Sequence, residues 1–245
     1  MKKLSVVMFV VCICLCISCA QLISNVILST VGYSTAISSQ YQSVYALCLH
    51  KNEDKSDVEE KKETLQAQNG AGFVYQKDGN YYLIASIYEN INDAEHVKNN
   101  LKSSGTDSEI LTIKLDDIKI EGSFSSDEKT ILNNCIKSKY EIFQKLYDVV
   151  VSLDTNLIDK SKAKLSLSEI FSSTVALKTN FETVFSQNIE EINLLKKQLS
   201  NSCQQLSNLV SEQYDSNNQT FSSLIKLCYC KILLGTYWQP TSCMI

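Results

Sequence analysis

Hydrophobic positions between Val44 and Leu115 follow a pattern that occurs twice. In each copy, two apolar runs typical of β-strands enclose a charged segment with helical spacing. The predicted strands span residues 44–49, 71–75, 81–88 and 110–115, and the predicted helices span 56–68 and 92–102. The order βαββαβ predicts an α+β, ferredoxin-like split βαβ domain over about 41–118, with both helices on one face of one sheet.

A four-residue segment, Lys77-Asp78-Gly79-Asn80, joins the two copies. Asp-Gly between two β-rich runs is the strongest short-range hairpin signal, because both central residues of a type I′ turn need positive φ. The sequence therefore predicts a tight turn that places residues 73–75 beside residues 81–83 as antiparallel neighbours.

After Gly122 the apolar positions recur every three to four residues, which indicates helices. The segment Ser125–Glu128 is a good helix start, because a hydroxyl caps free N–H groups and acidic residues oppose the helix dipole. The segment Asp154–Asn156 marks a turn, and a long helical pattern then runs from about Lys162 to Gln213. A last amphipathic segment covers Thr220–Tyr237.

This all-α region, residues 124–238, has two interpretations, and residues 239–245 form a short tail. The apolar stripe lies near heptad spacing but lapses at Thr174, Asn188 and Ser202. Those lapses favour an intramolecular helical bundle over a coiled coil that dimerises or docks a partner. Sequence alone does not separate the two.

The N-terminal segment predicts a membrane anchor over residues 1–40. Lys2 and Lys3 precede an apolar run, Leu4–Ile17, and the next lysine is Lys51. Such a pattern favours a single span with the N-terminus inside and the bulk of the chain outside the cytoplasm. A cleaved signal peptide ending at Ser18-Cys19-Ala20 is the competing interpretation.

Composition narrows the class of partner. The net charge is −4, and all basic residues are lysines. Because arginine supplies the bidentate contacts that phosphate and base edges favour, the sequence argues against a nucleic-acid partner. Abundant Asn, Ile and Lys suit an AT-rich genome, and we expect a low-GC Gram-positive bacterium.

The sequence offers no catalytic or metal-binding pattern. Its two histidines, His50 and His96, have no neighbouring nucleophile and orienting carboxylate, so we expect no enzyme and no cofactor. The six cysteines outside the apolar segment match no zinc template and are expected to be buried thiols. A disulfide among Cys228, Cys230 and Cys243 stays open.

The second copy resembles the SPOR (sporulation-related repeat) domain. The resemblance lies in the aromatic-led strand Tyr81–Tyr88, the helix segment Asp93-Ala94-Glu95, Leu101 and Gly105. The segments Tyr45–Leu49 and Gly70–Phe73 look like the equivalent first repeat, so that the resemblance covers about residues 42–117 and nothing else. The outward-facing anchor fits, because SPOR proteins are typically anchored in this way.

The resemblance implies binding of septal peptidoglycan, in particular of glycan strands stripped of stem peptides, on the open sheet face. The candidate glycan-binding residues are Tyr45, Tyr82, Ile84, Ser86 and Tyr88. This sequence departs from the family at Cys48 and Ile84, where Gln is frequent, and at Ile87, where Ser is frequent.

Strand 81–88 is therefore apolar on both faces. Alternation places Leu83, Ala85 and Ile87 on one side and Tyr82, Ile84, Ser86 and Tyr88 on the other. A strand with two apolar faces is usually covered on both. Either the second face is an aromatic glycan groove, or the C-terminal helices pack over it.

The sequence thus predicts a non-catalytic, single-pass membrane protein that binds cell-wall glycan at the division or sporulation septum. The alternative is a protein–protein interaction scaffold that acts through the C-terminal helices on a septal partner, with the SPOR-like domain structural.

Overall fold

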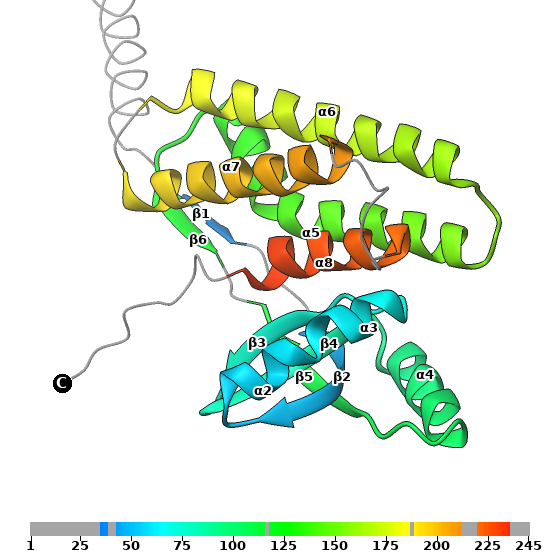
Figure 1. Ribbon diagram of the computed structural model, residues 1–245. Helices are drawn as coiled ribbons and strands as arrows, with labels where there is room; N and C mark the ends of the chain where they lie inside the picture. Colours follow the sequence, from blue (N-terminus) through cyan, green and yellow to red (C-terminus); the bar gives the residue numbers. More distant parts are fainter. Residues whose placement is uncertain (1–34, 39–42, 116–117, 187–188, 212–219, 236–245) are drawn as a thin grey trace, which may run out of the picture.

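The computed structural model describes residues 35–38, 43–115, 118–186, 189–211 and 220–235 (Figure 1). Most of the predicted anchor, residues 1–34, lies outside the described residues, as does Cys243. Within the described ranges, no helix is both long and apolar enough to cross a membrane.

Residues 43–115 form the predicted βαββαβ arrangement around a four-stranded antiparallel sheet. Its elements are β2 (Ser43–Asn52), α2 (Lys55–Glu60), α3 (Lys62–Ala67), β3 (Phe73–Lys77), β4 (Asn80–Tyr88), α4 (Ile91–Ser103) and β5 (Glu109–Lys114). The first predicted helix is interrupted, because Lys61, with φ −85° and ψ −8°, separates α2 from α3.

The strand order is β3-β4-β2-β5, and every neighbouring pair is antiparallel. The predicted hairpin is confirmed: Asp78 and Gly79 have φ of 50° and 78°, and Val74 pairs with Leu83. Positive φ at both central residues is what a type I′ turn requires, and it fixes the register of β3 on β4.

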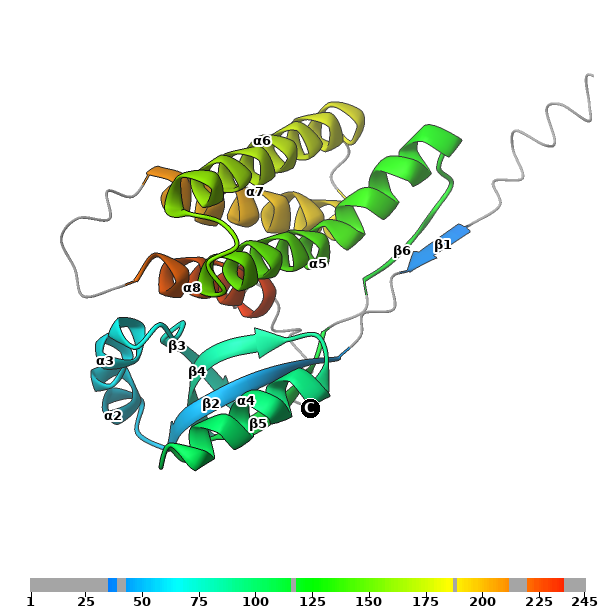
Figure 2. The ribbon, with the colours of Figure 1, turned by 90° about the vertical axis from the view of Figure 1, so that its right-hand side faces the viewer.

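The helices that connect the strands cover one face of this sheet. Val58 of α2 and Leu65 of α3 pack with Leu83 and Ala85 of β4 in one apolar cluster. Figure 2 shows α4 on the side of the sheet away from the C-terminal helices.

Four helices follow: α5 (Ser126–Asp154), α6 (Lys160–Val184), α7 (Glu190–Ser211) and α8 (Phe221–Leu234). The predicted start of α5 is confirmed by a capping box, in which Ser125 and Glu128 each bond the backbone N–H of the other. Thr220 caps α8 at its start.

The prediction of one long helical pattern over about 162–213 is wrong, because α6 and α7 are separate antiparallel helices. Phe185, at the end of α6, is buried, and its ring lies 4.9 Å from that of Phe181. The chain turns where this aromatic pair enters the core, and α7 begins again with Glu190 and Glu191 in its first turn, which suits the helix dipole.

A short ribbon, not predicted from the sequence, joins the two halves of the molecule. It pairs β1 (Thr35–Ser38) with β6 (Lys119–Gly122), with Ser38 opposite Lys119. Ile37 and Ile120 pack with residues of α5, α6 and α7 in one apolar cluster, so the ribbon belongs to the helical half. The sheet domain is thus inserted into the chain between two paired strands of the bundle.

Candidate functional site

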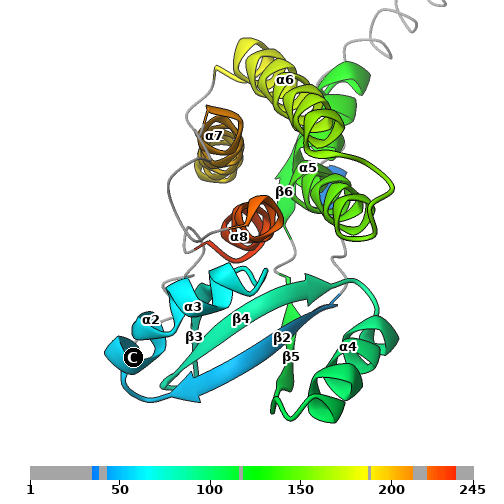
Figure 3. The ribbon, with the colours of Figure 1, turned by 45° about the vertical axis from the view of Figure 1, so that its right-hand side comes forward.

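The sheet face predicted to bind glycan is covered in the structure. Tyr82, Ile84 and Ser86 are buried, with 6%, 0% and 7% of their surface exposed, whereas Tyr45 and Tyr88 are half-buried. The cover over Tyr82, Ile84 and Ser86 is α8, which lies between the sheet and the other three helices (Figure 3). Of the two arrangements open from the sequence, packing of the C-terminal helices over this face is the one observed.

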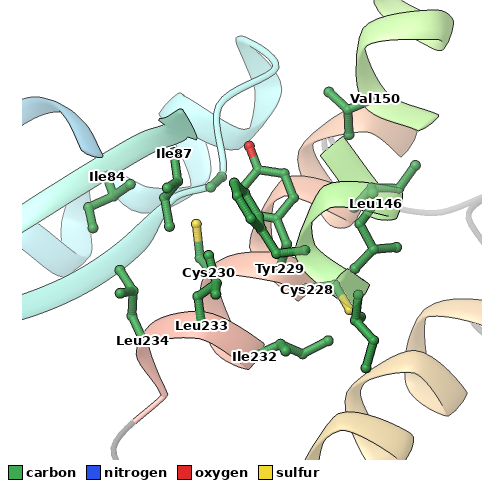
Figure 4. Packing of buried hydrophobic residues seen from close by; sticks show 14 of the residues in the cluster. Ile84, Ile87, Leu146, Val150, Cys228, Tyr229, Cys230, Ile232, Leu233 and Leu234 are labelled. Carbon is green, nitrogen blue, oxygen red and sulfur yellow. The ribbon is translucent and has the colours of Figure 1, made fainter. Parts of the chain in front are cut away.

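Side chains of α8 fill the space above the sheet (Figure 4). Tyr229, Cys230 and Leu233 belong to the same buried cluster as Ile84 and Ile87. On its other side α8 meets α5, where the rings of Phe143 and Tyr229 lie edge to face at 5.4 Å. One helix therefore completes the core of both halves.

Ile87 lies on the bundle side, contrary to the strict alternation predicted for β4. It clusters with Ile84, not with Leu83 and Ala85. The register between β2 and β4 shifts twice, on either side of Cys48, which pairs with Ile84. At such an irregularity neighbouring residues can point to the same side. Ser86 and Ile87 both reach α8, because Ser86 bonds Tyr229 and Ile87 belongs to its apolar cluster, so strict alternation fails at this point.

A hydrogen bond joins the sheet to α8 within this apolar contact. Ser86 Oγ and the Tyr229 hydroxyl lie 2.7 Å apart, and both side chains are buried. Burial raises the pKa of Tyr229 well above its usual value, so the hydroxyl stays neutral and can donate. Tyr229 was not a predicted site residue; it lies in the last predicted helical segment, and no local pattern indicated its partner.

A second polar contact lies at the start of α8 and centres on Asn69, in the α3–β3 connection. Asn69 Nδ2 donates to Asp154 Oδ1 (3.1 Å), and its Oδ1 accepts a hydrogen bond from Thr220 Oγ1 (2.5 Å). Lys226 Nζ donates to the Asn69 carbonyl (3.0 Å) and pairs with Asp154 Oδ2 (2.8 Å). We call Asn69, Asp154, Thr220 and Lys226 the Asn69 clamp.

A groove of about 450 Å³ lies between the start of α4 and α5. At its edge the rings of Tyr88 and Tyr147 meet edge to face at 6.2 Å. Its lining residues are Glu89, Asn90, Asp93, Glu141, Gln144, Lys145, Tyr147 and Asp148. Burial first, and then nearby Tyr88 and the carboxylates, raise the pKa of Tyr147 to about 12. Four carboxylates against one lysine make the groove acidic, which does not suit an anionic ligand.

His50 is held in a charged cluster at the end of β2. Its Nε2 lies 2.5 Å from Asp57 Oδ2, which also accepts hydrogen bonds from Asn52 Nδ2 (2.8 Å) and Lys61 Nζ (3.0 Å). The hydrogen bond to His50, followed by those to Asn52 and Lys61, holds the pKa of Asp57 well below its usual value. The cluster ties α2 to the strand before it; in the sequence, only the spacing between Asp57 and Lys61 indicated an ion pair.

The cysteines of the described residues are free thiols. Cys48, Cys135, Cys228 and Cys230 are buried, and Cys203 is half-buried. Burial raises the pKa of Cys48 to about 12, as it does that of Cys135. Such thiols stay protonated and behave as small apolar side chains.

No family model matches the chain, and no curated protein matches it. Among solved structures, similarity is found to the solution structure of the peptidoglycan binding domain of the B. subtilis cell wall lytic enzyme CwlC. The identity is 16%, the TM-score is 0.27, and the match covers 31% of this chain and 96% of that one. The similarity is weak.

Proposed function

We propose that this chain is a non-catalytic protein of the cell envelope that binds peptidoglycan glycan strands through residues 43–115. The observation that carries the proposal is the sheet. Its strand order, β3-β4-β2-β5, formed from elements in the order βαββαβ, is that of a ferredoxin-like split βαβ domain. This is the architecture that the resemblance to SPOR domains implies, and Tyr82 and Tyr88 lie on β4, where the repeat-like sequence is found.

The chemistry of the face supports an extended sugar chain as ligand. Tyr45 on β2 and Tyr88 on β4 are paired across the strands, and both are half-buried. Aromatic rings stack on the apolar faces of sugars, and Ser86 can bond a hydroxyl or an acetamide group. A groove along a sheet can hold several consecutive sugars, so that many weak contacts add up along the glycan strand.

The proposal includes the location. Lysines at positions 2 and 3 followed by the apolar run 4–17 support a single-pass anchor with the N-terminus inside. The resemblance to SPOR domains supports the division or sporulation septum as the place where the protein acts.

The test is retention of the full-length chain on isolated peptidoglycan sacculi, with and without amidase treatment that removes stem peptides. Binding should rise on the stripped sacculi and should fall in Tyr88→Ala. The matched control is Tyr81→Ala, because Tyr81 is a half-buried tyrosine of the same strand that packs on the opposite face. Equal loss in both variants would contradict recognition on the proposed face.

A second candidate function is an interaction scaffold acting through the helices. The observation that favours it is the cover itself, since α8 seals the sheet and leaves the outer helices as the available surface. Leu157 and Leu165, before and within α6, are 74% and 67% exposed. If these residues contact a second copy of the chain, Leu157→Lys/Leu165→Lys should abolish self-association in sedimentation experiments; a wild-type monomer at all concentrations would exclude this form of the scaffold.

A further inference from the structure

The chain enters and leaves the sheet domain at one end of that domain. Its chain enters after β1 and leaves before β6, and these strands lie side by side with Ser38 opposite Lys119. The ribbon packs with the bundle, not with the sheet. The sheet domain therefore has the connectivity of a unit that can turn about one end without disturbing the bundle.

The Asn69 clamp lies at the other end of the covering helix. Thr220 is the N-cap of α8, and the C-terminal end of α8 lies toward the β1–β6 ribbon (Figures 1 and 2). Asn69 is the only clamp residue that comes from the sheet domain, and it bonds all three others. A contact far from a pivot resists rotation most effectively, so the clamp is placed where it can hold the two halves together.

The cover can leave the sheet without leaving the bundle. On the bundle side α8 packs against α5 and α7. The ion pair between Lys226 and Asp154 also lies wholly within the helical half. Separation would break the contacts of Tyr229 and its α8 neighbours with the sheet, the ring contact between Tyr88 and Tyr147, and the bonds of Asn69. The contacts of α8 with its neighbouring helices would persist.

The groups of α8 that contact the sheet are chemically similar to those of the proposed glycan ligand. Tyr229 places a flat ring over the strands and a hydroxyl 2.7 Å from Ser86 Oγ. A sugar ring offers the same combination of an apolar face and a hydroxyl group. A glycan strand and α8 would therefore compete for one site.

We infer that the helical region is an internal cover of the glycan-binding face, closed by the Asn69 clamp, and that it must swing away before a glycan strand binds. This inference rests on the proposed function. The apparent affinity of such a protein is its intrinsic affinity reduced by the fraction of molecules that are open. Weakening the clamp should therefore tighten glycan binding, which is the opposite of what loss of a structural contact normally does.

The test compares Asn69→Gly with Asn156→Gly in the full-length chain. Both asparagines have positive φ, 70° and 57°, which glycine adopts without strain. Asn69→Gly removes two hydrogen bonds across the interface, whereas Asn156, in the α5–α6 turn, lies outside the clamp. We expect Asn69→Gly to bind amidase-stripped sacculi about tenfold more tightly than the wild-type protein. The amide hydrogens of β4 and α8 should exchange about tenfold faster in this variant. In Asn156→Gly, both the affinity and the exchange rates should equal those of the wild-type protein.

The two readouts separate failure of the cover from failure of the proposed function. If Asn69→Gly speeds exchange but neither it nor the wild-type protein binds sacculi, glycan binding is wrong, and its regulation falls with it. If both bind equally well, glycan binding stands and the cover is overturned. Unchanged exchange in a folded Asn69→Gly protein overturns the role of the clamp.

Discussion

One face of the four-stranded sheet is covered by helices that connect consecutive strands of the chain, and the other by a helix that lies far along the chain. On the first face, Val58 and Leu65 pack on Leu83 and Ala85. On the second, Tyr229 reaches Ser86 across 143 residues of sequence. The first cover follows from the βαββαβ topology, because each crossover helix must return over the sheet that it connects.

The two covers also differ in polarity. The cluster under α2 and α3 consists of apolar side chains and tyrosine. The contact with α8 is apolar at its centre, but it includes the Ser86–Tyr229 bond and the Asn69 clamp at one end. The first cover has its charged contacts at the end of β2, where His50, Asp57 and Lys61 join α2 to the strand. The second has a buried polar pair, and polar groups that water or a ligand can satisfy lower the cost of separation.

The largest expected effect comes from Tyr229→Ala. Tyr229 is fully buried between the sheet and Phe143, so its removal leaves a cavity and deprives Ser86 of its partner. We expect a loss of about 4 kcal/mol in the free energy of unfolding, measured by urea titration. A loss below about 1 kcal/mol would mean that α8 does not form a core with the sheet.

Adjacent residues of β4 sharpen the comparison, because Leu83 faces the crossover helices and Ile84 faces α8. We expect Leu83→Ala and Ile84→Ala each to cost about 3 kcal/mol in urea titration. Amide exchange in α8 should accelerate locally only in Ile84→Ala, since only that residue supports α8. Equal acceleration in both variants would show that the two faces unfold as one unit.

Local signals in the sequence were sufficient for the elements themselves. Asp78 and Gly79 determine the hairpin through their own φ angles, and Ser125 with Glu128 marks the start of α5. Such features depend on residues within a few positions of one another. The four strands of the sheet, the positions of the connecting helices and the starts of α5 and α8 were therefore predictable.

Contacts between distant segments were not predictable in the same way. The bulge that turns Ile87 toward the bundle depends on how β2 pairs with β4, and alternation along β4 alone does not reveal it. Pairing of β1 with β6 joins two four-residue strands with the whole sheet domain between them. The candidate face was identified as apolar, but which of two covers it receives depends on the packing of Tyr229, whose partner no local pattern specifies.

A smaller effect is expected from Lys226→Met, which tests the clamp. The side chain of Lys226 is 11% exposed and that of Asp154 is 32% exposed, so the pair is neither fully buried nor at the surface. Loss of one partner should cost about 2 kcal/mol, less than for a fully buried pair. Lys162→Met, which removes an exposed lysine from α6, is the control and should cost less than about 0.5 kcal/mol.

The same variant has a characteristic pH dependence. Burial raises the pKa of Asp154, but the hydrogen bond and charge of Lys226, together with hydrogen bonds from Ser222 and Asn69, lower it overall. A carboxyl with a lowered pKa in the folded state adds stability above the unfolded value of about 3.9, and that stability is lost as the pH falls through the folded pKa. The wild-type protein should therefore lose more stability than Lys226→Met between pH 5 and the folded pKa of Asp154; parallel curves would contradict this coupling.

The smallest expected effect concerns the hydrogen bond between Ser86 and Tyr229. Its measurement distinguishes two roles of this bond: stabilising the contact of α8 with the sheet, or specifying the position of α8. Ser86→Ala leaves the buried Tyr229 hydroxyl without its serine partner and should cost about 1 kcal/mol in urea titration. Ser86→Ala combined with Tyr229→Phe removes both polar groups and should recover most of that loss, because no unpaired hydroxyl remains in the apolar contact. If the double variant is instead as unstable as the sum of its single variants, the bond contributes directly to holding α8 on the sheet. In that case the polar contacts between α8 and the sheet are as much a part of the core as the apolar contacts under α2 and α3.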